Sequence, residues 1–199
     1  MTNSQKNVIL IFMVKAKEQK IEILQTGNPV LREVSSIIPT AQIKSPEIKK
    51  TISLMKTAIK NQKDAAAISA VQIGKPVRLF VISKNVLGID KEDPKDKKAK
   101  NDMVFINPKI TKVSKNKQDL EEGCLSVRYI YGKVLRPEKA TVEAYDEDGK
   151  KFSRGFSGLL SQIVQHETDH LNGILFTDKA TDLQEISHAD YEKMLKELK

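Results

Sequence analysis

Two histidines four residues apart constrain this chain more than any other feature. Residues 166–170 read His-Glu-Thr-Asp-His, and the chain has only three histidines. In an α-helix this spacing places both imidazoles on one face, a turn apart, where they can reach the same cation. Glu167 then lies beside the first imidazole, where its carboxylate can take a proton from water on that cation. We therefore expect a metal-binding helix here. A pair of ordinary, partly buried histidines is the less specific alternative.

A catalytic cation needs a third protein ligand. The extended metalloprotease pattern would continue with a glycine and a third histidine. Gly173 fits, but Phe176 stands in the last position and cannot be a ligand. Glu185 offers a carboxylate with nothing else in its favour. Cys124, the only cysteine, is the better candidate because a thiolate is a strong soft ligand and joins two imidazoles in a known catalytic set. Its alternative role is that of a small buried apolar residue.

The composition indicates one soluble globular domain. The chain has 199 residues, and 39% of them are hydrophobic and 30% charged. A lone cysteine forms no intrachain disulfide, which is compatible with a reducing compartment. We expect a cytoplasmic location. The net charge of +8 favours loose attraction to polyanions. Aromatic residues make up only 5% and tryptophan is absent, so neither base stacking nor sequence-specific nucleic-acid binding is expected.

Residues 1–18 are expected to form an N-terminal extension, and residues 19–199 a single catalytic domain. The extension contains the only long apolar run, Val8–Val14, which is too short to span a bilayer. Few cations precede the run, and no cleavage site with small residues follows it. We therefore prefer a loosely attached extension to a secretion signal, and we expect no membrane association.

Strand and helix signals are mixed without a regular alternation, which predicts an α+β fold. Ser45 and Pro46 mark a helix start, after which apolar residues recur every three or four positions. Asp148 and Gly149 predict a hairpin turn. Residues 84–102 are polar and aperiodic and are expected to form a surface insertion. The other expected elements are strands at Ile21–Leu24, Leu79–Ile82, Val104–Ile106, Thr141–Tyr145 and Phe152–Phe156, and helices at Ser157–Leu171 and Ser187–Leu198.

Residues 122–126 read EGCLS and residues 165–171 read QHETDHL. These two segments resemble motifs of the peptide deformylases, and both family motifs are intact. Residues 65–72, AAAISAVQ, resemble the G-x-G-x-A-A-x-Q motif less closely. The resemblance runs from about Ile21 to Asp178. It implies mixed and antiparallel strands around a central helix that carries the histidine motif. It also implies a hydrolase that removes formyl from the N-terminal formyl-methionine of nascent chains and releases formate.

The resemblance implies a role for each residue of the motifs. The metal ligands would be Cys124, His166 and His170. The metal would be ferrous iron, with zinc, nickel or cobalt as substitutes, and a water on it would be the nucleophile. Glu167 would be the general base and then the proton donor to the leaving amine. The side-chain N–H of Gln72 and the backbone N–H of Leu125 would stabilise the oxyanion.

The helix that carries the histidines also offers candidate pocket residues. Leu159 and Ile163 precede His166 by seven and three residues, so they share its face and can line a pocket for a methionine side chain. Ordinary core packing is an equally good explanation of their spacing. Gln162 stands where the family commonly has an apolar pocket residue, and a solvated helix position is its alternative.

Further substrate contacts are expected outside this helix. The segment with Ala66 and Ala67 would pair with the peptide backbone, and Glu122 is expected to belong to the same site as an orienting residue. Arg136 is expected to reach a carbonyl or carboxylate of the peptide, with a plain surface position as its alternative.

The first motif departs from the family at three positions. Ala65 and Ala67 replace glycines, and Ser69 replaces an alanine. Glycine tolerates positive φ and close backbone approach, whereas a Cβ restricts both. The two added methyl groups can narrow or shift the groove, so we expect weaker or altered activity relative to a standard member.

Two other functions compete with deformylation. A metallopeptidase of the His-Glu-x-x-His type would keep its metal without Cys124. A catalytically weak homologue that binds formyl peptides or the ribosome would hold a peptide without turnover. Lys193, Lys196 and Lys199 could touch ribosomal RNA near the exit tunnel, although a solvated helix explains them better.

Overall fold

The computed structural model describes residues 21–87 and 101–197. The expected N-terminal extension, 1–18, lies outside these ranges, as does most of the expected surface insertion. The start of that insertion forms the short helix α3 (Lys84–Leu87), whose last residue is buried.

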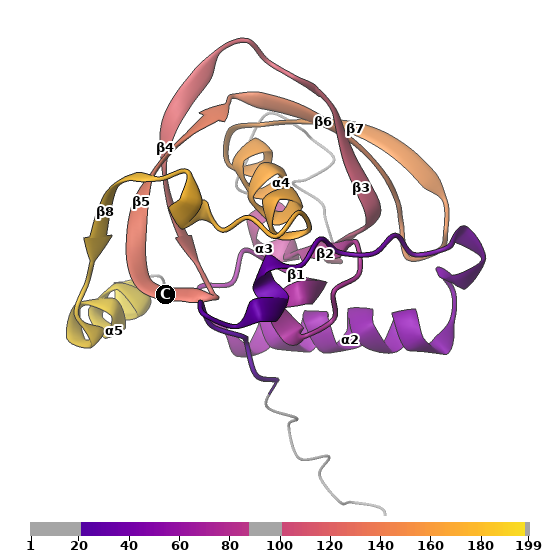
Figure 1. Cartoon of the computed structure of the whole chain (residues 1–199), viewed down its shortest axis with the longest axis horizontal. Coiled ribbons are helices and arrows are strands. Elements are labelled where there is room, and N and C mark those ends of the chain that lie inside the picture. The colour runs from indigo at the N-terminus through magenta and orange to yellow at the C-terminus, as the bar shows by residue number, and fades with distance from the viewer. Residues whose placement is uncertain (1–20, 88–100, 198–199) are drawn as a thin grey trace, which may run out of the picture.

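Helix α4 (Gly158–His170) lies in the middle of the molecule and contacts strands of both sheets (Figure 1). It is the expected helix with the histidine motif, and Ser157 occupies its N-cap position in extended backbone. A helix enclosed in this way buries side chains around most of its circumference. The buried ones are Leu160, Ser161, Ile163, Val164, Gln165, Glu167, Thr168 and His170.

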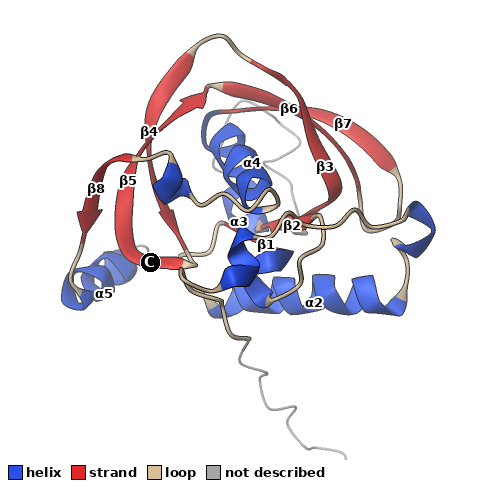
Figure 2. Cartoon of the chain, viewed as in Figure 1, coloured by secondary structure: helices blue, strands red, loops and turns tan. Residues whose placement is uncertain are grey.

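Within the described residues, eight strands form two antiparallel sheets around α4, drawn in red in Figure 2. The five-stranded sheet has the order β1 (Ala67–Ser69), β2 (Leu79–Ile82), β3 (Met103–Val113), β6 (Lys139–Tyr145) and β7 (Lys151–Ser157). The three-stranded sheet has the order β4 (Lys117–Cys124), β5 (Val127–Pro137) and β8 (Thr181–Glu185). The α+β prediction is confirmed.

The strand predictions are confirmed for β2, β6 and β7 and for the first part of β3, but one is wrong. Ile21–Leu24 belongs to no strand. Its Leu24 N–H donates to the carbonyl of Gln72, which lies in the 3₁₀ helix η3 (Ala70–Ile73). The long strands β4 and β5 are not predicted because polar and charged residues interrupt their apolar alternation. Most of β4 is exposed, so it needs no regular apolar face.

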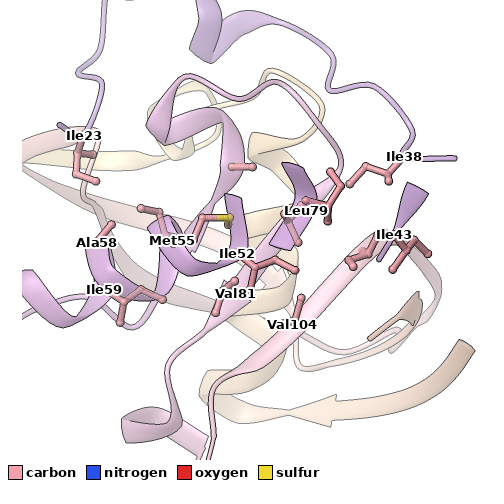
Figure 3. Close-up of a cluster of buried hydrophobic side chains, with 14 of the residues drawn as sticks. Ile23, Ile38, Ile43, Ile52, Met55, Ala58, Ile59, Leu79, Val81 and Val104 are labelled. Carbon is pink, nitrogen blue, oxygen red and sulfur yellow. The ribbon is translucent and has the colours of Figure 1, made fainter. Parts of the chain in front are cut away.

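Helix α2 (Pro46–Asn61) begins as expected, because the Ser45 side chain accepts a hydrogen bond from the Ile48 N–H. Its predicted apolar stripe is buried and packs against β2 and the start of β3 (Figure 3). The stripe consists of Ile48, Ile52, Met55 and Ile59. This cluster supports the sheet that carries β1 into the centre of the fold.

The other helical elements connect the sheets or close the chain. They are η1 (Pro29–Arg32), η2 (Thr40–Gln42), η5 (Phe176–Asp178) and α5 (His188–Glu197). Helix α5 is fastened by Tyr191, whose hydroxyl donates to Asp64 over 2.7 Å and accepts from Arg128. None of the described helices is both long and apolar enough to cross a bilayer.

The turn after α4 supplies a stability prediction. Gly173 has φ +72°, and a Cβ added there would lie 2.4 Å from the Arg32 carbonyl oxygen. We expect Gly173→Ala to lower the free energy of unfolding by about 2–4 kcal/mol, through backbone strain plus the clash. Gly74→Ala is the matched control, because Gly74 has φ +74° but its nearest neighbour would be 3.9 Å away. Gly74→Ala should lower the free energy of unfolding by about 1 kcal/mol. Equal losses in urea denaturation would contradict the steric argument.

Candidate metal centre

The three ligands named by the sequence come together at one point. Cys124 ends β4, and His166 and His170 lie one turn apart on α4. One ligand atom from each lies within 4.8 Å of the others, and the Cys124 Sγ is 3.3 Å from the His170 Nε2. A tetrahedral ion with ordinary thiolate and imidazole bonds separates two such atoms by about 3.5 Å. The donor set therefore fits a divalent metal ion.

The charge state of the cysteine suits metal binding. Burial raises the pKa of the Cys124 thiol, but the adjacent imidazoles of His170 and His166 outweigh this and bring its pKa to about 6. Cys124 is thus mostly a thiolate at neutral pH, the form that binds metals.

Glu122 orients the first histidine. Its Oε2 lies 2.9 Å from the Nδ1 of His166, which leaves the Nε2 of that ring for the metal. Burial raises the pKa of Glu122, but hydrogen bonds from His166 and Arg136 outweigh it and hold the pKa at about 2. The glutamate therefore stays ionised and acts on the metal site through the imidazole.

The predicted contact between Arg136 and the peptide is not what the structure contains. The Arg136 side chain is only 4% exposed, and it donates to both carboxylate oxygens of Glu122 over 2.8 and 3.0 Å. It also donates to Asp169 over 2.6 Å. Two acidic residues in the intact motifs need a buried cation, and this is the signal that could have identified Arg136 as a supporting residue.

Removing the Arg136 guanidinium should destabilise the folded protein. We expect Arg136→Met to lower the free energy of unfolding by about 3–5 kcal/mol, because it leaves the carboxylate of Glu122 buried without its main partner. Lys133→Met is the control, because it breaks an ion pair with Asp182 in which both side chains are more than half exposed. That change should stay within about 0.5 kcal/mol. Similar losses for both variants in urea denaturation would contradict the importance of burial.

The cleft beside the metal ligands has a volume of about 250 Å³. A larger hollow of about 820 Å³ along α2 contains none of the metal ligands. The cleft brings together most of the predicted site residues. Those that line it are Ala66, Ala67, Gln72, Glu122, Cys124, Leu125, Leu159, Gln162, Ile163, His166 and Glu167. Sequence reasoning missed Asp64, Arg128, Tyr129, Tyr131 and Tyr191, which also line it.

Hydrogen bonds fix the orientation of Gln72. Its Oε1 accepts from the Ser69 backbone N–H over 2.8 Å. Its Nε2 is therefore turned toward the metal ligands and lies 3.6 Å from the Cys124 Sγ. Leu125 follows Cys124 directly in the turn between β4 and β5. Both expected oxyanion donors thus lie beside the cysteine.

Gln162 is not a free surface residue. Its amide donates to the Glu121 carbonyl over 2.8 Å and so ties α4 to β4 at the edge of the cleft. Ile163 is 7% exposed and Leu159 39% exposed. The apolar wall expected from the helix spacing is therefore present, with Leu159 at its more open end.

The family model for polypeptide deformylase matches residues 20–185. The chain is 39% identical over 172 residues to the peptide deformylase of Psychrobacter cryohalolentis, covering 85% of this chain and 84% of that protein. It is 38% identical over 159 residues to the peptide deformylase of Rhizobium meliloti, covering 79% and 83%.

Solved structures agree with these sequence matches. A peptide deformylase of Synechococcus elongatus in complex with actinonin has a TM-score of 0.68 and 31% identity, covering 92% of this chain and 87% of that one. A class I type b peptide deformylase of Acinetobacter baumannii has a TM-score of 0.70 and 27% identity, covering 80% and 98%. With both intact motifs converging on one metal centre, this chain belongs to the polypeptide deformylase family.

Proposed function

We propose that this chain removes the formyl group from the N-terminal formyl-methionine of nascent polypeptides in the cytoplasm. Membership of the deformylase family makes it a hydrolase of N-formyl groups. The observation that carries the proposal is the convergence of Cys124, His166 and His170 beside a cleft that also contains Glu167.

The three ligands would hold one divalent ion. Bound there, it would lower the pKa of a coordinated water to about 7. The ligand set by itself also accepts zinc, nickel and cobalt. We therefore propose ferrous iron as the native ion on the resemblance to the family alone.

The residues around the ion supply the proton transfer and the stabilisation of the oxyanion. Glu167 accepts a proton from the attacking water as the new C–O bond forms at the formyl carbon. It then gives that proton to the amine nitrogen as the C–N bond breaks, leaving formate and a free N-terminus. Gln72 and Leu125 donate N–H groups to the oxyanion, each worth about 3 kcal/mol at a fixed position.

The position of β1 supports the proposed peptide contact. β1 is an edge strand of the five-stranded sheet and carries Ala67, while Ala66 directly precedes it. A free strand edge can pair with an extended peptide. The methionine side chain would then lie against Ile163 and Leu159.

Formate release tests the proposal directly. We expect anaerobically purified protein to contain about one metal ion per chain and to release formate from formyl-Met-Ala. A chelator should abolish the release, and added Fe²⁺ should restore it. Bound metal without formate would instead support the peptide-binding homologue.

Ala65 and Ala67, which stand where the family motif has glycines, lead to a prediction about activity. Neither Ala65 nor Ala67 has positive φ, so their effect on activity must come from the added methyl groups. Ala67 is 7% exposed and lines the cleft. Ala65→Gly combined with Ala67→Gly is expected to raise kcat/KM for formyl-Met-Ala. An unchanged value would rule out these methyl groups as the cause of any weak activity.

Ribosome binding remains a weaker proposal. Lys193 and Lys196 are exposed on α5, and Lys199 lies outside the described residues. Cosedimentation with ribosomes, compared between the full chain and a Lys193→Glu, Lys196→Glu variant, would test it.

A further inference from the structure

We propose that Ser69 is a positioning residue for the general base, holding the carboxylate of Glu167 by one oxygen so that the other faces the cleft. The inference rests on the proposed role of Glu167. Ser69 ends β1 and is completely buried. Its Oγ donates to the Glu167 Oε2 over 2.7 Å, across 98 residues of sequence.

The hydroxyl has two acceptors on the same residue. Besides the carboxylate, its Oγ lies 3.1 Å from the Glu167 backbone carbonyl oxygen. A hydroxyl has one proton to donate, and the shorter bond to a charged carboxylate is the stronger of the two. Contacts to both the backbone and the side chain of Glu167 restrict the carboxylate to one orientation relative to α4.

Ser69 serves both proposed catalytic side chains. Its backbone N–H donates to the Gln72 Oε1 over 2.8 Å, and its hydroxyl donates to the Glu167 carboxylate. The base and the oxyanion donor are therefore set relative to each other by one residue at the end of β1. Ser69 itself does not line the cleft, whereas Gln72 and Glu167 do.

The hydroxyl of Ser69 is a donor that the family motif does not supply at this position. The motif that residues 65–72 resemble has alanine here, and alanine cannot donate a hydrogen bond. Glu167 is itself only 5% exposed, so solvent cannot replace the lost donor efficiently. In this chain the orientation of the base therefore depends on the Ser69 hydroxyl.

The test compares Ser69→Ala with the wild type, both fully loaded with metal. We expect kcat for formate release to fall about tenfold, as for loss of a hydrogen bond to a charged group. KM and metal content should not change, because Ser69 touches neither the cleft nor the ligands. Ser83→Ala is the matched control: Ser83 is 1% exposed and lies outside this cleft. Its kcat should match the wild type.

A double mutant separates the two proposals. If the hydroxyl acts through the carboxylate, Ser69→Ala should not lower kcat further in a Glu167→Gln background. An inactive Glu167→Gln enzyme beside a fully active Ser69→Ala enzyme would overturn the inference and leave the proposed function intact. Parallel losses of metal or changes in KM for Ser69→Ala would also overturn it. A fully active Glu167→Gln enzyme would instead refute the assignment of the base.

Discussion

Glu167→Gln is expected to lower kcat for formate release by about 10²–10⁴-fold, the usual contribution of a positioned acid–base group. Glutamine keeps the size of the side chain and can still accept from the Ser69 hydroxyl, but its amide cannot take a proton from water. Metal content and the free energy of unfolding should therefore stay near the wild-type values. Single-turnover measurements at high enzyme concentration will resolve the remaining activity.

Glu185→Gln is the control for this variant. Glu185 was the other carboxylate considered from the sequence, and it is exposed at the end of β8. The Glu185→Gln variant should retain the wild-type kcat. A small effect of Glu167→Gln, comparable with that of Glu185→Gln, would mean that another group moves the proton.

Cys124→Ser is expected to remove both metal and activity. A serine hydroxyl is not ionised at neutral pH, so the substitution replaces a thiolate with a weak neutral ligand. After dialysis, elemental analysis should find little bound metal, and formate release should fall to background. His188→Ala is the control, because His188 is exposed on α5, outside the group formed by Cys124, His166 and His170.

The Cys124→Ser variant also discriminates between a deformylase and a metallopeptidase. A metallopeptidase that uses the histidine pair with a different third ligand would keep its metal without Cys124. Stoichiometric metal in Cys124→Ser, together with cleavage of an unformylated peptide, would favour that alternative. The 3.3 Å separation between the Cys124 Sγ and the His170 Nε2 argues for the deformylase arrangement.

The metal centre could be predicted from the sequence because its parts follow from local rules or from chemical type. The helix brings His166 and His170 to one face at a spacing of four, whatever surrounds it. Cys124 follows from being the one thiol available. The start of α2 at Ser45 and its buried stripe are equally local, since a capping side chain and a repeat of three or four residues lie within one segment.

Only the tertiary structure determined which distant groups became partners. The antiparallel register of β4 and β5 places Gln118 opposite Arg136 and Gly132 opposite Glu122, yet the two buried side chains of Arg136 and Glu122 meet in an ion pair. Ser69 meets Glu167 because an edge strand ends beside the central helix. Ile21–Leu24 is apolar enough for a strand, yet it pairs with none of the strands in the described part of the chain.

The chain's own residues therefore determined the ligands, the helix that presents them and the class of reaction. The fold decided which buried charges neutralise each other and which hydroxyl meets the base. The physical reason is range: helix geometry and ligand chemistry act over a few residues, whereas a buried hydrogen bond depends on where two distant segments of the backbone come to lie.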